Sequence, residues 1–106
     1  MKKELVKQLK EIKELTELQL EYEDVYKIMA HTIEEFGEFS AAVCAEDGGV
    51  GKAYKKDTLK ESSKEEGVDL IICAFAAFFA RGGTIKQFNE ICPRKLKKWK
   101  QNQKNC

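Results

Sequence analysis

Three glutamates occur among bulky apolar residues in the segment IEEFGEF, residues 33–39. A second acidic cluster, EEGVD at residues 65–69, leads directly into an apolar run. On a helix, side chains three residues apart lie on the same face. Each cluster can therefore direct two carboxylates to a common point, and two such helices packed together would present four. These are the carboxylates of Glu35, Glu38, Glu66 and Asp69.

Asp69 is the residue for which a purely structural role is hardest to accept. It is the only charged residue from Val68 to Ala80, in a stretch that is apolar on every side and is expected to be buried all round. An isolated ionised carboxylate in such a place is very costly, so it must be paired, protonated or bound to metal. The nearest basic residues, Lys64 and Arg81, lie near the helix ends. A divalent cation held by four carboxylates would explain both clusters.

Each cluster also has a simpler interpretation. Glutamates three residues apart are common on the solvated face of a helix, and this is the favoured interpretation of Glu35 and Glu38 taken alone. The acidic residues at 65–66 would form a capping box with Ser62 or Ser63 if their helix began late. Neither interpretation explains the aspartate in the apolar run.

The types of the ligands indicate which metal such a site would hold. Oxygen ligands favour Mg²⁺, with Mn²⁺ as a substitute, and Mg²⁺ sites commonly include substrate phosphates. Zinc is not favoured, because the four cysteines form no close pair and His31 is the only histidine. A di-iron carboxylate centre needs Glu-x-x-His pairs, whereas His31 precedes its neighbouring glutamates. His31 is interpreted as a helix-surface residue that contacts Glu35 one turn on.

Apolar periodicity predicts an all-α fold of four helices in a single domain, residues 1–106. Leucine and isoleucine recur at helical spacing over residues 3–20, and a second apolar pattern covers 24–45. A break near 22–24 separates the two segments, and Asp24 has the residue type of an N-cap. Two consecutive amphipathic helices are therefore expected in the first half of the chain.

The second half is expected to contain the other two helices. A loop with glycine and lysine, residues 46–56, precedes a helix predicted to begin near Asp57 or Thr58 and to run to Ala80. The glycines at 82–83 should end this helix.

Thr84 and Gln87 have capping-box spacing and predict the start of the last helix. Pro93 is expected to kink or restart it, and a basic tail follows at about 94–106.

The composition limits the classes of function. Hydrophobic residues make up 42% and charged residues 35%, and the formal net charge of +1 gives no overall attraction to nucleic acid or membrane. The longest apolar run is too short to span a bilayer. Without a secretory signal or paired cysteines, a cytoplasmic, reduced protein is expected. Cys44 and Cys73 are interpreted as small buried apolar side chains, and Cys106 as a loose terminal thiol.

The two acidic clusters resemble the signature of a known family. Glu34-Glu35-Phe-Gly-Glu38 followed by Glu66-Gly-Val-Asp69 is similar to the EExxE…ExxD pattern of the MazG-like, all-α nucleotide pyrophosphatases. This group includes dimeric dUTPases and phosphoribosyl-ATP pyrophosphatases. The resemblance covers residues 20–100, with the order of the helices, the apolar run and the basic final helix. It implies a four-helix MazG-like bundle, assembled as an intertwined homodimer or a dimer of dimers.

The resemblance also implies an activity. The family cleaves a nucleoside or deoxynucleoside triphosphate, with Mg²⁺, into the monophosphate and pyrophosphate, and such enzymes clean the nucleotide pool. The implied metal ligands are Glu35, Glu38, Glu66 and Asp69. The implied catalytic carboxylates are Glu34, Glu35 and Glu38. The lysines expected to contact the substrate phosphates are Lys52, Lys55 and Lys95.

Three alternatives remain open. In the first, the chain is a non-enzymatic helical interaction module, in which residues 5–18 pack on partner helices. In the second, the basic tail and Trp99 bind nucleic acid, although one aromatic residue among lysines gives this little support. In the third, the same metal site acts on another phosphate ester, such as phosphoribosyl-ATP. Nothing in the sequence selects a base.

Overall fold

The computed structural model describes residues 2–47 and 62–104. These residues form four helices: α1 (Lys2–Gln19), α2 (Val25–Glu46), α3 (Ser63–Ala80) and α4 (Ile85–Lys104). No strand occurs in this part of the chain. The predicted all-α, four-helix class is confirmed, and the bounds of the first two helices agree with the sequence to within a residue or two.

The break between α1 and α2 lies where the sequence predicts it, and Asp24 is the N-cap of α2. Asp24 has an extended backbone conformation, and its side chain accepts a hydrogen bond from the Lys27 amide at 3.0 Å. An N-cap of this kind satisfies one of the backbone donors that the first turn of a helix leaves free. The turn before it is closed by backbone hydrogen bonds, including the one from the Glu23 amide to the Gln19 carbonyl.

Helix α3 begins later than predicted. Ser62 is its N-cap, with an extended backbone, and the Ser62 hydroxyl accepts a hydrogen bond from the Glu65 amide at 3.3 Å. The prediction of one continuous helix from Asp57 or Thr58 to Ala80 is therefore wrong, because the backbone at residue 62 is extended. Residues 57 and 58 themselves lie outside the described part of the chain.

Two glycines separate α3 from α4. Gly82 has φ of +91°, a conformation that side chains with a Cβ rarely adopt. A Cβ on Gly83 would clash with the Phe78 ring, so this position has no room for a side chain. The capping box predicted for α4 is reciprocal: Thr84 N donates to Gln87 Oε1, and Gln87 N donates to Thr84 Oγ1, both at 3.0 Å.

Helix α4 is continuous through Pro93, so the helix does not restart at this residue, and the alternative of a kink there stays a prediction. The basic residues from 94 onward belong to the same helix rather than to a separate tail. Proline removes one backbone hydrogen bond from a helix interior. Here that loss occurs on an exposed part of α4.

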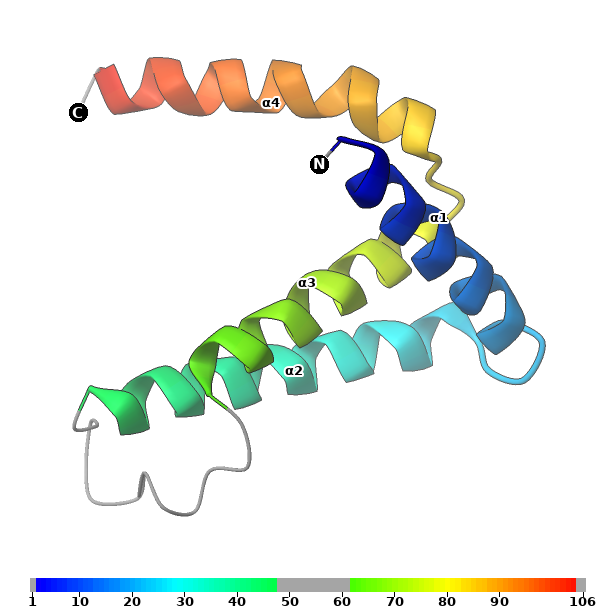
Figure 1. Ribbon diagram of the computed structural model, residues 1–106, viewed down its shortest axis with the longest axis horizontal. Coiled ribbons are helices and arrows are strands. Elements are labelled where there is room, and N and C mark those ends of the chain that lie inside the picture. The colour runs from blue at the N-terminus through cyan, green and yellow to red at the C-terminus, as the bar shows by residue number, and fades with distance from the viewer. Residues whose placement is uncertain (1, 48–61, 105–106) are drawn as a thin grey trace.

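Helices α2 and α3 pack side by side in antiparallel directions, and α1 crosses α3 (Figure 1). The buried apolar side chains of the described residues are few: Leu9, Ile28, Ala42, Ala45 and Phe79. Helix α4 leaves α3 at a bend of 115°. Its first turns are held by aromatic contacts, with the Phe75 and Phe88 rings 5.2 Å apart in an edge-on arrangement.

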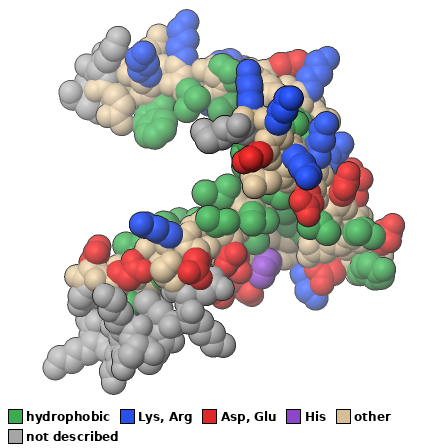
Figure 2. All heavy atoms as spheres, viewed as in Figure 1, with side chains coloured by type: hydrophobic (Ala, Val, Ile, Leu, Met, Phe, Trp, Pro, Cys, Tyr) green, Lys and Arg blue, Asp and Glu red, His purple; other side chains and the backbone are tan. Residues whose placement is uncertain are grey.

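The chain does not close into a compact monomer. Its radius of gyration is 16.5 Å, whereas a compact domain of about 100 residues has one of about 13 Å. Hydrophobic side chains line the inner edge of the open angle between α4 and the α2–α3 pair (Figure 2). The expectation that α3 is buried all round is wrong for a single chain, because Val68, Ile71 and Ile72 are 54%, 57% and 42% exposed.

None of the described helices is by itself long and apolar enough to cross a membrane. Among the described helices, only the bent pair of α3 and α4 taken together has the length and apolar composition of a candidate membrane span.

Candidate metal centre

Helices α2 and α3 bring three of the predicted carboxylates together. Glu35 and Glu38 come from one face of α2, and Glu66 comes from the first turn of α3. One carboxylate oxygen from each lies within 4.8 Å of the other two. The prediction that the two acidic segments, residues 33–39 and 65–69, meet is therefore confirmed for these three residues. From here on, the acidic cluster means Glu35, Glu38 and Glu66.

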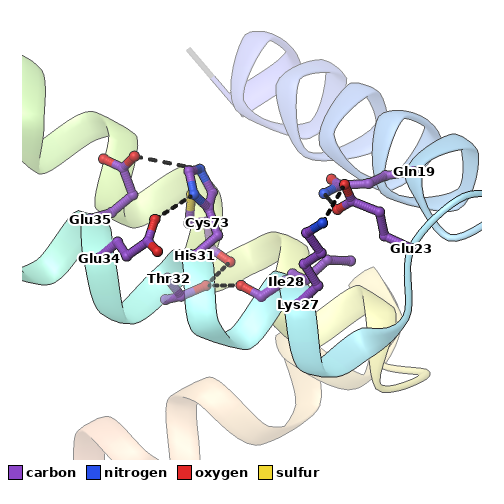
Figure 3. Close-up of polar contacts among 9 residues, drawn as sticks. All are labelled: Gln19, Glu23, Lys27, Ile28, His31, Thr32, Glu34, Glu35 and Cys73. Carbon is purple, nitrogen blue, oxygen red and sulfur yellow. Dashed lines mark hydrogen bonds and ion pairs between the residues drawn. The ribbon is translucent and has the colours of Figure 1, made fainter.

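Hydrogen bonds on both sides of the acidic cluster fix the register of the two helices. At one end, the Glu46 carboxylate accepts hydrogen bonds from the Ser63 amide at 2.7 Å and from the Ser63 hydroxyl at 2.6 Å. At the other end, the Thr32 hydroxyl lies 3.2 Å from the Cys73 carbonyl oxygen and 2.9 Å from that of Ile28 (Figure 3). Its single proton is shared between these two acceptors.

A glycine lets the helices approach between these two contacts. A Cβ on Gly67 would lie 3.2 Å from the Phe39 ring, which is tighter than an ordinary contact. Gly67 directly follows Glu66, so the close approach occurs where α3 contributes its ligand to the acidic cluster. The glycine inside the second acidic motif thus has a packing role that positions the carboxylate.

Glu35 is the innermost member of the acidic cluster. It is only 9% exposed, and its Oε2 atom is buried with no hydrogen-bond partner among the described residues. Burial raises the pKa of Glu35 above its usual value. The nearby Glu38 and Asp69 carboxylates and a side-chain hydrogen bond with Glu38 raise this pKa further, while His31 lowers it. A buried acceptor without a donor is costly. A bound cation would remove that cost, because it supplies the missing positive charge.

Asp69 lies beside the acidic cluster but is not within the group of three. Its side chain is half-buried rather than enclosed, which corrects the expectation of full burial. It is close enough to raise the pKa of both Glu35 and Cys73 electrostatically. Asp69 therefore adds negative charge to the site without being placed as a fourth neighbour of the three glutamates.

Glu34 faces away from the acidic cluster. Its side chain is 71% exposed, and its Oε2 atom lies 3.6 Å from His31 Nδ1 (Figure 3). The other ring nitrogen, Nε2, lies 3.5 Å from Glu35 Oε1. The predicted contact between His31 and Glu35 is present, at a distance longer than a good hydrogen bond. The imidazole thus lies between two carboxylates on α2.

Cys73 is the residue that sequence reasoning missed. Its thiol sulfur belongs to a group with His31 and Glu35 in which the three ligand atoms lie within 4.8 Å of one another. Burial raises the pKa of the Cys73 thiol, and the carboxylates of Glu35, Asp69 and Glu38 raise it further. One signal was available: Cys73 follows Asp69 by four positions, which places both on the same face of a helix.

The lysines predicted to contact phosphate are not assembled at this centre. Lys52 and Lys55 lie outside the described residues. Lys95 is exposed on α4, whereas the carboxylates lie on α2 and α3. Within the described part of one chain, no predicted lysine is therefore placed at the acidic cluster.

Comparisons with known proteins give no match to this chain. No protein-family model matches it, and neither a curated protein nor a solved structure matches it significantly. The resemblance to the MazG-like family therefore depends on the residues of the two acidic motifs.

Proposed function

We propose that this protein is a Mg²⁺-dependent nucleoside triphosphate pyrophosphohydrolase of the MazG-like type. It would convert a nucleoside or deoxynucleoside triphosphate into the monophosphate and pyrophosphate. The observation that carries the proposal is the convergence of carboxylates from two helices around Glu35, whose buried Oε2 atom has no hydrogen-bond partner in the described chain. The same residues form the two motifs that resemble the family signature.

The residues of the acidic cluster fit an oxygen-ligated cation. Mg²⁺ binds oxygen ligands at about 2.0–2.1 Å, so neighbouring ligand oxygens in its octahedron lie about 2.9 Å apart. The three carboxylate oxygens lie within 4.8 Å of one another, a span that modest side-chain rotations can close. Asp69, one turn after Glu66, is the proposed fourth carboxylate. When bound, Mg²⁺ would neutralise the triphosphate charge and orient the bond that breaks.

The carboxylates would divide the work according to their exposure. Glu35 is buried, so its carboxylate is suited to holding a cation in a fixed place. Glu38 is exposed on the same face of α2, where it can meet both substrate and solvent. We assign to Glu38 the role of accepting a proton from the attacking water. Glu34 would act as an auxiliary carboxylate through its contact with His31.

The proposed enzyme is a homodimer or homotetramer. The extended shape of the chain and the exposed apolar side chains of α3 support this, because a second copy could cover them. An assembly would also allow Lys95 of one chain to approach the acidic cluster of another. We further propose a cytoplasmic role in removing surplus or noncanonical nucleotides.

One observation favours the interaction module as a second candidate. Leu5, Leu15 and Leu18 on α1 are 55%, 59% and 53% exposed, so this helix also offers an apolar surface to a partner. That candidate gives no reason for the acidic cluster, and we therefore rank it second.

Pyrophosphate release from a panel of canonical and modified nucleoside triphosphates tests the proposal. The panel is run with Mg²⁺, with Mn²⁺ and with EDTA, and it includes phosphoribosyl-ATP as a different phosphate ester. We expect metal-dependent formation of equal amounts of monophosphate and pyrophosphate, lost in Glu38→Gln. Folded protein that releases no pyrophosphate from any compound with metal present would contradict the proposal and favour the interaction module.

A further inference from the structure

We propose that His31, Glu35 and Cys73 form a second metal site, selective for cations of the zinc class, which shares Glu35 with the acidic cluster. The three side chains offer one nitrogen, one oxygen and one sulfur ligand from two helices. Nitrogen and sulfur ligands suit zinc and similar transition metals, whereas carboxylate oxygens suit magnesium. Glu35 thus lies between two sets of ligands of different chemistry.

The distances fit a tetrahedral ion. With metal–ligand bonds of about 2.0–2.1 Å, neighbouring nitrogen and oxygen ligands of zinc lie about 3.3 Å apart. His31 Nε2 is already 3.5 Å from Glu35 Oε1. A sulfur ligand at about 2.3 Å from the ion would lie about 3.6 Å from the nitrogen. The group spans at most 4.8 Å, so a small rotation of the Cys73 or His31 side chain completes the geometry.

The second nitrogen of the imidazole lies near a carboxylate that could orient the ring of a metal-binding histidine. Histidine ligands commonly donate their other ring N–H to a carboxylate, which fixes the tautomer and the orientation of the ring. Here Glu34 Oε2 lies 3.6 Å from His31 Nδ1, beyond hydrogen-bond distance, and a small rotation of the exposed Glu34 side chain would complete the contact (Figure 3). That arrangement leaves Nε2, the nitrogen near Glu35, as the one that can bind a metal. Glu34 is a positioning residue for this site.

Cys73 is held at the site from the opposite side. Its carbonyl oxygen lies 3.2 Å from the Thr32 hydroxyl, one residue after His31 on α2. This contact fixes the position of Cys73 along the axis of α2. The thiol itself is free of any disulfide and is half-buried, so it is available as a ligand and is shielded from bulk solvent.

Two further observations point to a ligand at this place. Glu35 Oε1 faces His31, and the other carboxylate oxygen, Oε2, is buried with no hydrogen-bond partner among the described residues, so Glu35 keeps an acceptor that a cation or a proton would satisfy. A cavity of about 200 Å³ between α1, α2 and α3 includes His31 and Cys73 in its lining. Its other walls are largely apolar, with Ile28 and Ile72 among them. The cavity leaves room for a water or a small anion as the fourth ligand.

Sharing of Glu35 would couple the two sites. A carboxylate drawn toward the imidazole and the thiolate would be withdrawn from Glu38 and Glu66. Zinc would therefore weaken Mg²⁺ binding at the acidic cluster, and Mg²⁺ would weaken zinc binding by the same factor, since linkage between binding sites is reciprocal.

The test uses Co²⁺ as a spectroscopic probe of zinc sites, with the reduced full-length protein. Co²⁺ bound to a thiolate gives a sulfur-to-metal charge-transfer absorption that oxygen-ligated Co²⁺ lacks. We expect this absorption in the wild type, and we expect zinc to abolish it by displacing Co²⁺. Cys73→Ser should lose the absorption, whereas the matched controls Cys44→Ser, Cys92→Ser and Cys106→Ser should keep it.

Two other variants separate this site from the acidic cluster. His31→Gln, at a position with a 54% exposed side chain, should weaken Co²⁺ binding at least tenfold without unfolding the protein. Glu38→Gln should keep the thiolate absorption, because Glu38 belongs only to the acidic cluster. The proposal is overturned if the wild type shows no thiolate absorption, if Cys73→Ser retains it, or if His31→Gln binds Co²⁺ as tightly as the wild type. None of these outcomes depends on nucleotide hydrolysis.

Discussion

The α2–α3 pair and α4 differ in how the chain itself supports them. The antiparallel pair is joined at one end by hydrogen bonds between Ser63 and Glu46 and toward the other end by the contact of Thr32 with the Cys73 carbonyl. The acidic cluster lies between these contacts. Helix α4 is attached through the aromatic contacts of its first turns and then extends away (Figure 1).

The same contrast appears in the exposure of side chains. Glu35, at the centre of the α2–α3 site, is 9% exposed, whereas Leu96 and Trp99 on α4 are 52% and 62% exposed. The basic residues of α4 accompany these apolar ones along an amphipathic helix. One chain thus preorganises the carboxylates, while α4, which carries more basic residues than any other helix, has little support from the rest of the chain. A complete site, in the proposed enzyme, would need a second chain to place α4.

The largest expected effect tests whether the carboxylates held between α2 and α3 bind the metal. Glu66→Gln should lower Mg²⁺-dependent pyrophosphate release at least about a hundredfold, or about 2.7 kcal/mol in the barrier, because it removes a metal ligand. The matched control is Glu65→Gln on the preceding, exposed position, which should keep near wild-type activity. Circular dichroism checks that both variants stay helical. Equal activity of the two variants would remove Glu66 from the site.

The next-largest effect tests whether a second copy of the chain covers the exposed apolar surface of α3 and α4. Ile71 is 57% exposed and lines a groove of about 250 Å³ with Phe75, Phe78 and Phe88. Ile71→Asp would place a charge in that groove, so it should shift the oligomer toward monomer, weakening association at least about tenfold.

Light scattering coupled to gel filtration measures the mass, with Leu18→Asp as the control. Leu18 is similarly exposed, at 53%, but lies on α1. Dissociation by Leu18→Asp and not by Ile71→Asp would locate the contact surface on α1 and would favour the interaction module.

A smaller effect is expected from the contact that sets the α2–α3 register. Thr32→Val removes the hydroxyl that faces the Cys73 carbonyl and keeps the side-chain volume, so it should lower the free energy of unfolding by about 1 kcal/mol. Chemical denaturation measures this value. Thr32→Ser keeps the hydroxyl and serves as the control. A Val variant as stable as the wild type would show that the contact contributes nothing to stability.

The smallest effect is the pH dependence of the metal-free protein. The pKa of Glu35 is raised in the folded chain above its ordinary value of 4.5, so protonated Glu35 favours folding. Its stabilising contribution is full below the unfolded pKa and is lost as pH rises through the raised folded pKa. In EDTA, the melting temperature of the wild type relative to Glu35→Gln should therefore fall as pH rises above 4.5. A constant difference across this range would show that Glu35 is not desolvated.

Much of the fold follows from local sequence patterns. Apolar periodicity placed α1 and α2, and residue type alone identified the Asp24 cap and the reciprocal pair of Thr84 and Gln87. The start of α3 was harder, because Thr58, Ser62 and Ser63 all offer capping oxygens in one short stretch. In the folded chain, the hydrogen bond from the Glu65 amide to the Ser62 hydroxyl shows that Ser62 is the N-cap of α3.

The candidate site was predictable within each helix and not between helices. Spacing of three residues placed Glu35 and Glu38 on one face, and the confirmed meeting with Glu66 follows from packing two such faces together. The proximity of Cys73 to His31 depends instead on the register of α3 against α2. That register is set by contacts between distant residues, such as the close approach at Gly67, which no local pattern reveals.

Binding of Mn²⁺, followed by the loss of the free-ion electron paramagnetic resonance signal, tests the central claim most directly. The wild type should bind Mn²⁺ at the acidic cluster, and added Mg²⁺ should displace it. Glu38→Gln should weaken binding at least about tenfold, while Glu65→Gln should leave it unchanged. If the wild type binds no Mn²⁺, or if Glu38→Gln binds it as tightly as the wild type, the acidic cluster is not the metal site and the proposed enzyme loses its basis.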